Sequence, residues 1–323
     1  MKLSFRLCGA LLYFAALHFA AAQAYPAKPI RLIMPLVAGS ASNDILGRAL
    51  AQRVSESLGQ PVVVDYRPGA AGNIGSSLAA KAPPDGYTLL IGYTSSIMIS
   101  PILHPSADYH PLTDLAPIAR FATVPYVVVA HPSVPATNLK ELIALARARP
   151  GELHVASAGS GSLPHLAAEL FKMITKVDIV HVPYKGAAPA ANDLIGGHVQ
   201  LSFSGITGIA PSIKAGKLRA LAVTMPKRSA LLPDVPTSAE SGLPGFEVTS
   251  SLGILAPAKT PATIVRRLYD EIAKIVNGAD MKRFIHIQGA EPALMDAAQF
   301  AEHIKTEAAK WASVIKTANV KAD

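Results

Sequence analysis

Two periodicities of hydrophobic and polar residues alternate along the chain. Short apolar runs rich in Val, Ile and Leu are typical of buried strands, and between several of them apolar residues recur every three or four positions, as in an amphipathic helix. The expected strands cover residues 30–35, 62–65, 88–92, 126–130, 179–183, 199–203, 218–224 and 252–256. Strands that alternate with helices predict an α/β protein with largely parallel sheets buried under helices.

Two of the predicted helices carry clear signals at their starts. One begins at Ser42, a residue type favoured at N-caps, has Asp44 in its first turn, and is stopped by Gly59. The last helix begins at Asp296, and Gln299 three residues later completes a capping-box pattern. In both segments the apolar residues at helical spacing are expected to face the core.

The sequence has no long flexible linker to divide it into domains. Two extended, proline-containing stretches, residues 122–132 and 247–257, are the candidates for crossings between two lobes. If both are crossings, the middle of the chain forms one lobe and both ends form the other. We therefore expect lobe 1 to comprise residues 25–124 and 251–323, and lobe 2 to comprise residues 125–250. The chain of 323 residues is long enough for two domains.

The first 24 residues have the three parts of a secretory signal peptide. Lys2 and Arg6 form the positive region, residues 7–22 form an apolar stretch, and Ala22-Gln23-Ala24 is a small-x-small cleavage site. A membrane anchor is the alternative, but a spanning helix needs about 20 strongly apolar residues and this stretch is rich in alanine. We expect export to the periplasm, with cleavage after Ala24.

Composition excludes several classes of function. The single cysteine, Cys8, lies in the predicted signal peptide, so the mature chain has no disulfide and no Cys-ligated metal. The net charge is +8, but Lys and Arg do not cluster with aromatic residues, so we expect no nucleic-acid partner. A basic balance without such clusters fits a general attraction for small anions. We expect a monomer without a cofactor or a metal.

Two Gly/Ser-rich loops lead from an apolar run straight into a helix, at residues 35–44 (PLVAGSASND) and 155–165 (VASAGSGSLPH). Glycines let the backbone turn and approach a ligand closely, and the N–H groups and positive dipole end of the following helix point at the same spot. Each loop alone is also read as an ordinary strand-to-helix turn. Two such loops favour an anion site between two lobes. His165, in the first turn of the second helix, either touches the anion or makes a local structural bond.

The sequence lacks the motifs of the common catalytic sites. Neither Ser160 nor Ser204 has the flanking glycines of a nucleophile elbow, and there is no P-loop and no H-E-x-x-H. Pro164 stands where a dinucleotide fingerprint beginning at Gly159 needs its third glycine. The other histidines show no ligand spacing and are read as core or surface residues. We expect no enzymatic activity; a secreted hydrolase that uses the cleft serines is the alternative.

Long stretches of the sequence carry a pattern more specific than any single glycine motif. They include YPAKPIRLIMPLVAG from Tyr25, GQPVVVDYRPGAAGNIGS from Gly59, PPDGYTLLIG from Pro83, VHVPYKGAAPAANDLIGGHVQLSF from Val180 and RSALLPDVPTSAESGLPGFE from Arg228. In these stretches the chain resembles the Bug family of extracytoplasmic solute receptors, the binding-protein components of tripartite tricarboxylate transporters. The resemblance implies a two-lobed periplasmic binding protein fold with a ligand cleft between the lobes, a small carboxylate as ligand and transporter membrane subunits as partners.

The resemblance also implies which residues bind the ligand. Two loops would clasp a carboxylate through backbone N–H groups, hydroxyls and water. The implied residues are Val37, Ala38, Gly39, Ser40, Ser42 and Asn43 in the first loop, and Ser157, Gly159, Ser160 and Ser162 in the second. His165 is added from its place in the first turn of the helix that follows. Thr94, Ser95 and Tyr184 follow strand ends, and ligands of open α/β sheets bind beyond the carboxyl ends of strands.

Ser204 follows the strand at residues 199–203, where many members of the family have an acidic residue. A buried ammonium group needs a countercharge, and Asp44, the acid in the first loop, is assigned to its helix N-terminus. We therefore expect carboxylates without an α-amino group as ligands. An orphan receptor with a sensing role is the alternative to a transport receptor.

Overall fold

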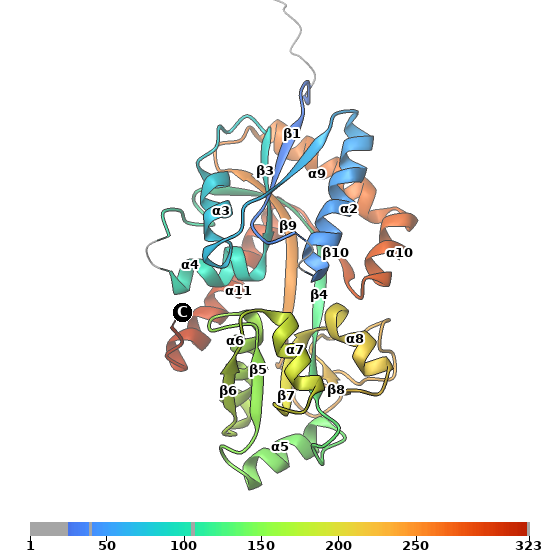
Figure 1. The fold of residues 1–323 in the computed structure, drawn as a ribbon. Helices are drawn as coiled ribbons and strands as arrows, with labels where there is room; N and C mark the ends of the chain where they lie inside the picture. The colour runs from blue at the N-terminus through green and yellow to red at the C-terminus, as the bar shows by residue number, and fades with distance from the viewer. Residues whose placement is uncertain (1–24, 39–40, 105–106, 322–323) are drawn as a thin grey trace, which may run out of the picture.

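The computed structural model describes residues 25–38, 41–104 and 107–321 (Figure 1). The predicted signal peptide lies outside the described residues. The elements are β1 (Ile30–Met34), α2 (Ala41–Leu58), β2 (Val62–Tyr66), η1 (Ala70–Gly72), α3 (Asn73–Ala80), β3 (Thr88–Tyr93), η2 (Ser95–Ile99), α4 (Ser100–Leu103), β4 (Leu115–Ala130), α5 (Leu139–Ala148), β5 (His154–Ser157), α6 (Leu163–Thr175), β6 (Val180–Pro183), α7 (Ala187–Ile195), β7 (Leu201–Gly205), α8 (Ile206–Lys214), β8 (Arg219–Val223), β9 (Thr249–Pro257), α9 (Ala262–Asn277), α10 (Ala279–Ile287), β10 (Glu291–Met295) and α11 (Ala297–Thr317). Every expected strand overlaps an observed one, and the α/β class is confirmed.

The strands join edge to edge in the order β2-β1-β3-β9-β4-β7-β5-β6, and β8 and β10 also pair with β4. β1 runs parallel to β2 and β3, and β5 runs parallel to β6 and β7. Each pair that includes β4 or β9 in the described part of the chain is antiparallel. The prediction of largely parallel sheets is therefore wrong at the centre of the molecule. The reason is that β4 and β9 carry the chain between the two halves in opposite directions (Figure 1).

β4 belongs to both halves of the sheet. Its residues 115–125 pair with β9, whereas Tyr126 and the residues after it pair with β7 and β8. The sequence predicted only residues 126–130 as a strand, because Pro117, Arg120 and Pro125 interrupt the apolar pattern before them. Register shifts beside Pro117 and Arg120 accommodate these residues in the ladder. The halves built on β1 and on β5 are the upper and lower parts of the molecule in Figure 1.

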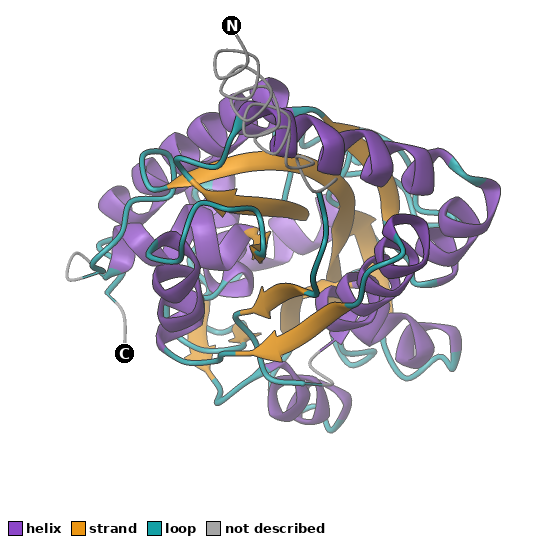
Figure 2. Ribbon diagram, turned by 90° about the horizontal axis from the view of Figure 1, so that it is seen from above, coloured by secondary structure: helices purple, strands orange, loops and turns teal. Residues whose placement is uncertain are grey.

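Helices pack around both halves of the sheet (Figure 2). One apolar cluster, around Leu46, joins the β1 half to α2, α9 and α10. A second, around Leu194, lies under α7 and α8. A third spans both halves, since Ile33 of β1 belongs to the same cluster as Phe203 of β7, together with Trp311 of α11. The two halves therefore share a core. No helix in the described ranges is long and apolar enough to cross a lipid bilayer.

Candidate functional site

The first predicted loop leaves β1 at Pro35 and enters α2. Val37 and Ala38 are exposed, whereas Ser42 is buried and Asn43 is partly exposed in the first turn of α2. The predicted residues Gly39 and Ser40 lie outside the described residues. The loop follows the carboxyl end of β1, next to the carboxyl end of the parallel strand β3. This is the edge of an open α/β sheet at which ligands bind.

Asp44, in the first turn of α2, is almost fully buried. Its carboxylate accepts a hydrogen bond of 2.7 Å from the Tyr66 hydroxyl and forms an ion pair of 3.2 Å with Arg48. Burial and this carboxylate raise the pKa of Tyr66. The positive end of the helix dipole also favours a negative charge at this place. The Asp44 carboxylate is thus engaged within its own half of the molecule, as the sequence indicated.

The second predicted loop connects β5 to α6 and is held together by its own side chains. The buried Ser157 hydroxyl contacts the Gly159 carbonyl at 3.1 Å and accepts from the Gly159 N–H at 3.2 Å. The Ser162 hydroxyl donates to the Gly159 carbonyl at 2.6 Å, and Ser162 is the N-cap of α6 without a side-chain cap bond. Gly159 and Gly161 have φ of 126° and 72°, where a side chain causes strain. Ser160, between them, is partly exposed.

Two histidines stabilise this loop through hydrogen bonds. The N–H of Gly161 donates to Nδ1 of His165 at 3.0 Å, and Nε2 of His181 lies 2.6 Å from the Ser157 hydroxyl. The rings of His165 and His181 stack in parallel, with centroids 3.7 Å apart. Of the two roles open to His165, the structure therefore contains the local structural bond. Sequence reasoning missed the role of His181, since only the fold brings the start of α6 onto β6.

The remaining predicted residues occupy the ends of other strands. Thr94 is fully buried; its hydroxyl accepts from the Ser251 N–H at 2.9 Å and so ties the end of β3 to β9, while Ser95 is partly exposed. The Tyr184 hydroxyl donates to Asp193 at 2.7 Å, and burial together with that carboxylate raises the pKa of Tyr184 to about 12. The hydroxyls of Ser204 and Ser202 lie 2.8 Å apart at the end of β7.

Contacts between the halves bring these strand ends close to their boundary. α2 contacts α8, and the Thr207 hydroxyl of α8 donates to the Gln288 carbonyl after α10 at 2.5 Å. Leu103, at the end of α4, lies so close to Gly161 that a Cβ there would be 2.4 Å from its Cδ1. The two loops thus lie at the boundary between the halves. Together they offer backbone N–H groups and hydroxyls, an arrangement suited to binding an anion.

The sequence reasoning did not select the turn at residues 69–72, although it lies against the first loop. All four residues of this turn have positive φ. A Cβ on Gly72 would lie 3.3 Å from the Pro35 carbonyl oxygen and from the Tyr93 hydroxyl. Tyr93 in turn donates to that carbonyl at 3.0 Å. The available signal was the PGAAG segment inside the resemblance, where two glycines flank two alanines.

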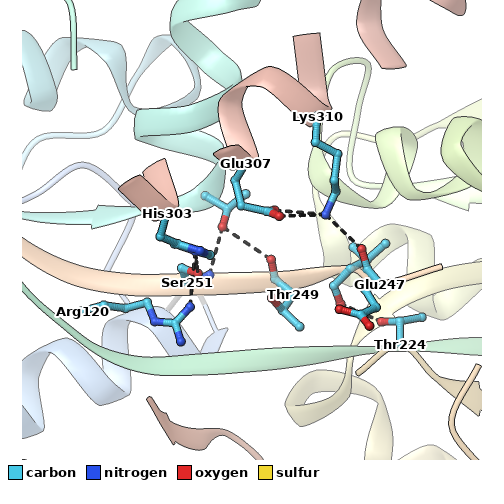
Figure 3. Close-up of polar contacts among 10 residues, drawn as sticks. Arg120, Thr224, Glu247, Thr249, Ser251, His303, Glu307 and Lys310 are labelled. Carbon is cyan, nitrogen blue, oxygen red and sulfur yellow. Dashed lines mark hydrogen bonds and ion pairs between the residues drawn. The ribbon is translucent and has the colours of Figure 1, made fainter. Parts of the chain in front are cut away.

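A polar cluster from α11 lies along the two crossing strands (Figure 3). Nε2 of His303 contacts the Ser251 hydroxyl at 2.7 Å and a guanidinium nitrogen of Arg120 at 3.3 Å. Burial and the nearby Arg120 charge lower the pKa of His303 to about 4. Two helical turns further on, Lys310 pairs with Glu307 at 2.9 Å and donates to the Glu247 carbonyl at 3.1 Å. The last helix is therefore bonded to both crossings.

Other features of the described residues do not contribute to this site. Surface cavities of about 410 and 330 Å³ lie along β1 and β2 and beside α3, and no residue of either predicted loop lines them. No group of His, Cys, Asp and Glu side chains in residues 25–38, 41–104 and 107–321 is arranged to hold a metal ion.

Comparisons with known proteins place these features in a family. The sequence profile described as "Tripartite tricarboxylate transporter family receptor" matches residues 46–320. The chain is 38% identical over 301 residues to Protein BugT of Bordetella pertussis, covering 93% of this chain and 92% of that protein. It is 38% identical over 294 residues to the UPF0065 protein in the tcbD-tcbE intergenic region of Pseudomonas sp., covering 91% of this chain and 87% of that protein.

Solved structures agree with the sequence comparisons. R. palustris Rpa4515 with adipate has 37% identity and a TM-score of 0.82, over 93% of this chain and 100% of that one. The periplasmic binding protein BugD has 33% identity and a TM-score of 0.78, over 93% and 100%. MatC from Rhodopseudomonas palustris with bound malate has 29% identity and a TM-score of 0.76, over 90% and 100%. The two-lobed periplasmic binding protein fold expected from the sequence is confirmed.

Proposed function

The chain belongs to the family of tripartite tricarboxylate transporter receptors, and from this premise we propose that it is a periplasmic receptor that binds a small carboxylate and releases it unchanged. Rpa4515 is solved with adipate and MatC with malate. Both ligands are dicarboxylates, so a dicarboxylate is the ligand class that we propose first. The two predicted loops are proposed to hold it.

The geometry of the second loop is the observation that carries this proposal. Ser157 and Ser162 are both bonded to the Gly159 carbonyl. The loop therefore keeps its shape without a ligand, and it leads into α6, whose N-terminal dipole favours a negative charge. A preformed loop loses little conformational entropy on binding, which increases affinity.

A catalytic role for this site is not proposed, although Ser157 and His181 have the spacing of a nucleophile and its base. Ser157 has only 1% of its surface exposed, so a substrate has no access to its hydroxyl. His181 stacks on His165, and its contact with Ser157 braces the loop. The serine–histidine pair is therefore better explained as part of the loop's own framework than as the site of a secreted hydrolase.

We further propose that the ligand lacks an α-amino group. Three acids close to the loops are engaged: Asp44 contacts Tyr66 and Arg48, Glu169 pairs with Lys172 at 3.0 Å, and Asp193 accepts from Tyr184. Ser204, at the end of β7, provides a neutral hydroxyl. An ammonium group would lose its water at this place without gaining a countercharge, which is costly.

The remaining predictions from the sequence are proposed on the same basis. They are export with cleavage after Ala24, two lobes that meet where β4 changes partners, and a periplasmic monomer that delivers its ligand to tripartite transporter membrane subunits. Support for the lobe boundaries comes from the pairing of Pro125 with β9 and of Tyr126 with β7.

Titration calorimetry of the mature chain with adipate, malate, succinate and aspartate tests the proposed function. At least one of the dicarboxylates without an amino group should bind, more tightly than aspartate. A ligand present at about a hundred times its Kd should add roughly 2.7 kcal/mol to the free energy of unfolding. The ligand recovered by mass spectrometry after incubation should be chemically unchanged.

A pair of serine variants locates the site in the same experiment. Ser160→Leu places a bulky side chain in the second loop and should abolish the heat of binding. Ser313→Leu, on the exposed surface of α11, is the matched control and should bind as the wild type does. Failure of the wild type to bind any carboxylate would refute the function, whereas normal binding by Ser160→Leu would refute the placement of the site.

A further inference from the structure

Tyr126 stands where β4 passes from one half of the sheet to the other. Pro125 pairs with Thr249 of β9, and Tyr126 pairs with Gly205 at the end of β7. The Tyr126 carbonyl accepts hydrogen bonds from the N–H and the hydroxyl of Thr224, at 2.9 and 3.0 Å. The backbone of Tyr126 is therefore held firmly, and the ring extends from a fixed point at the boundary between the halves.

The ring of Tyr126 is surrounded by protein and yet solvent still reaches part of it. Its strand neighbours Val124 and Val127 have 3% and 0% of their surfaces exposed, whereas Tyr126 and Tyr93 are only partly buried. Burial is nevertheless the main cause that raises the pKa of both tyrosines, and Tyr93 also raises the pKa of Tyr126. Both side chains are thus partly buried, and they lie close enough for one to influence the other.

The neighbours of the two rings belong to both halves of the molecule. The Tyr93 hydroxyl donates to the Pro35 carbonyl, where the first loop begins. The ring of Tyr126 reaches Gly205, since a Cβ there would lie 3.9 Å from its Cε2. Gly205 follows Ser204 and directly precedes α8. The tyrosines therefore connect the end of β1 in one half with the end of β7 in the other.

The hydroxyl of Tyr126 lacks the hydrogen bond to protein that the hydroxyls of four other tyrosines make. Tyr66, Tyr93, Tyr109 and Tyr184 each donate to a protein acceptor. None of the residues in the described ranges forms a hydrogen bond with the Tyr126 hydroxyl. A partly buried polar group without a protein partner is costly, and a bound ligand can provide that partner.

We propose that the Tyr126 hydroxyl is a ligand-binding group that donates a hydrogen bond to an oxygen of the bound carboxylate. This inference rests on the proposed function and adds a residue from the crossing strand to the two loops. The phenol stays neutral and keeps its proton at neutral pH, so it acts as a donor. Because Tyr126 belongs to neither loop, it contacts a ligand only when that ligand lies fully between the halves.

The variant Tyr126→Phe tests the inference because it removes the hydroxyl alone. With the tightest-binding ligand among adipate, malate and succinate, the Kd should rise roughly tenfold or more, as for a lost hydrogen bond to a charged group. The melting temperature of the unliganded protein should stay at the wild-type value. Tyr109→Phe is the matched control: its hydroxyl donates to the Ser96 carbonyl at 2.9 Å, so this variant should lower the melting temperature and leave the Kd unchanged.

Each other result counts against the inference. An unchanged Kd for Tyr126→Phe, with a wild type that binds, overturns the ligand contact and leaves the proposed function intact. A fall in the unliganded melting temperature as large as that of Tyr109→Phe shows that the Tyr126 hydroxyl has an internal partner, and it overturns the inference independently of any ligand. A wild type that binds none of the three dicarboxylates overturns the function and this inference together.

Discussion

The two glycine- and serine-rich loops look alike in the sequence but are held in different ways. The second loop is bonded to itself, through Ser157 and Ser162 on the Gly159 carbonyl, and is braced by His165. The described residues of the first loop are held at its base, where Tyr93 contacts Pro35. Val37, beyond that base, has 63% of its surface exposed.

This difference shows that one composition serves two structural roles. In the second loop the serine hydroxyls shape the backbone, so that the loop presents its N–H groups and helix dipole in a fixed arrangement. In the first loop the support comes from neighbouring segments: Tyr93 of β3 donates a hydrogen bond to the Pro35 carbonyl, and the turn at residues 69–72 lies against the same carbonyl. Changes inside the second loop should therefore have larger effects than changes at the base of the first.

The largest effect is expected from Gly161→Val. Gly161 has a φ of 72°, and a Cβ there would lie 2.4 Å from Cδ1 of Leu103. Backbone strain and this clash should together lower the free energy of unfolding by about 2 to 3 kcal/mol. Carboxylate affinity should fall roughly a hundredfold, because the displaced loop no longer holds its N–H groups in the arrangement that binds the ligand. Chemical denaturation and calorimetry measure the two effects.

Gly216→Val is the control for backbone strain alone. Gly216 has a φ of 70° and no atom within 4 Å of the position of a Cβ. The Gly216→Val variant should lose about 1 to 2 kcal/mol of stability and keep its affinity for the ligand. Equal behaviour of the two glycine variants would mean that the contact between the second loop and Leu103 has no effect.

A smaller effect is expected from the histidine that braces the second loop. His165→Leu removes the acceptor of the Gly161 N–H, and an unsatisfied buried donor costs about 1 to 2 kcal/mol. Ligand affinity should fall roughly tenfold. His165→Asn places an oxygen near the former Nδ1 and should recover most of the affinity. Calorimetry and the amide chemical shift of Gly161 report on this, and an Asn variant no better than Leu would contradict the positioning role.

The smallest effect is expected at the base of the first loop, from Asp44→Asn. The substitution removes the charge that pairs with the half-exposed Arg48, and stability should fall by about 1 kcal/mol. The ligand should bind slightly more tightly, with a Kd within about threefold of the wild-type value, because the substitution removes a negative charge near the proposed anion site. The pKa of Tyr66 should fall toward its ordinary value, as a spectroscopic titration measures. Weaker ligand binding would place Asp44 in direct contact with the ligand.

The local sequence pattern was sufficient to predict where the strands and helices lie, but not whether neighbouring strands run parallel or antiparallel. Continuous apolar runs predict buried strands because such strands need apolar side chains on both faces, and Asp296 with Gln299 forms the capping box expected from their spacing. The first half of β4 was missed because Pro117 and Arg120 are tolerated only through its register shifts. The antiparallel centre follows from two crossings in opposite directions, which no local pattern contains.

The positions of the two loops were accessible from the sequence, whereas the directions of their side chains were not. A hydroxyl that faces a ligand and one that faces its own loop have the same sequence pattern, so the bonds of Ser157 and Ser162 needed the fold. The His165–His181 stack needs β6 beside β5, and the accessible hydroxyl of Tyr126 depends on where β4 changes partners. These features come from tertiary contacts between distant segments.

The path of the chain determines the order in which the two halves of the sheet can be completed. The half of the sheet built on β5 is continuous in the chain between the crossings, whereas the half that begins with β1 needs β9 and β10 to be complete. As the chain emerges where it folds, its middle can therefore fold before its beginning does. Trp311, in the last helix, joins the core shared by both halves only at the end. Until those last segments are present, the half of the sheet that contains the first strands stays incomplete.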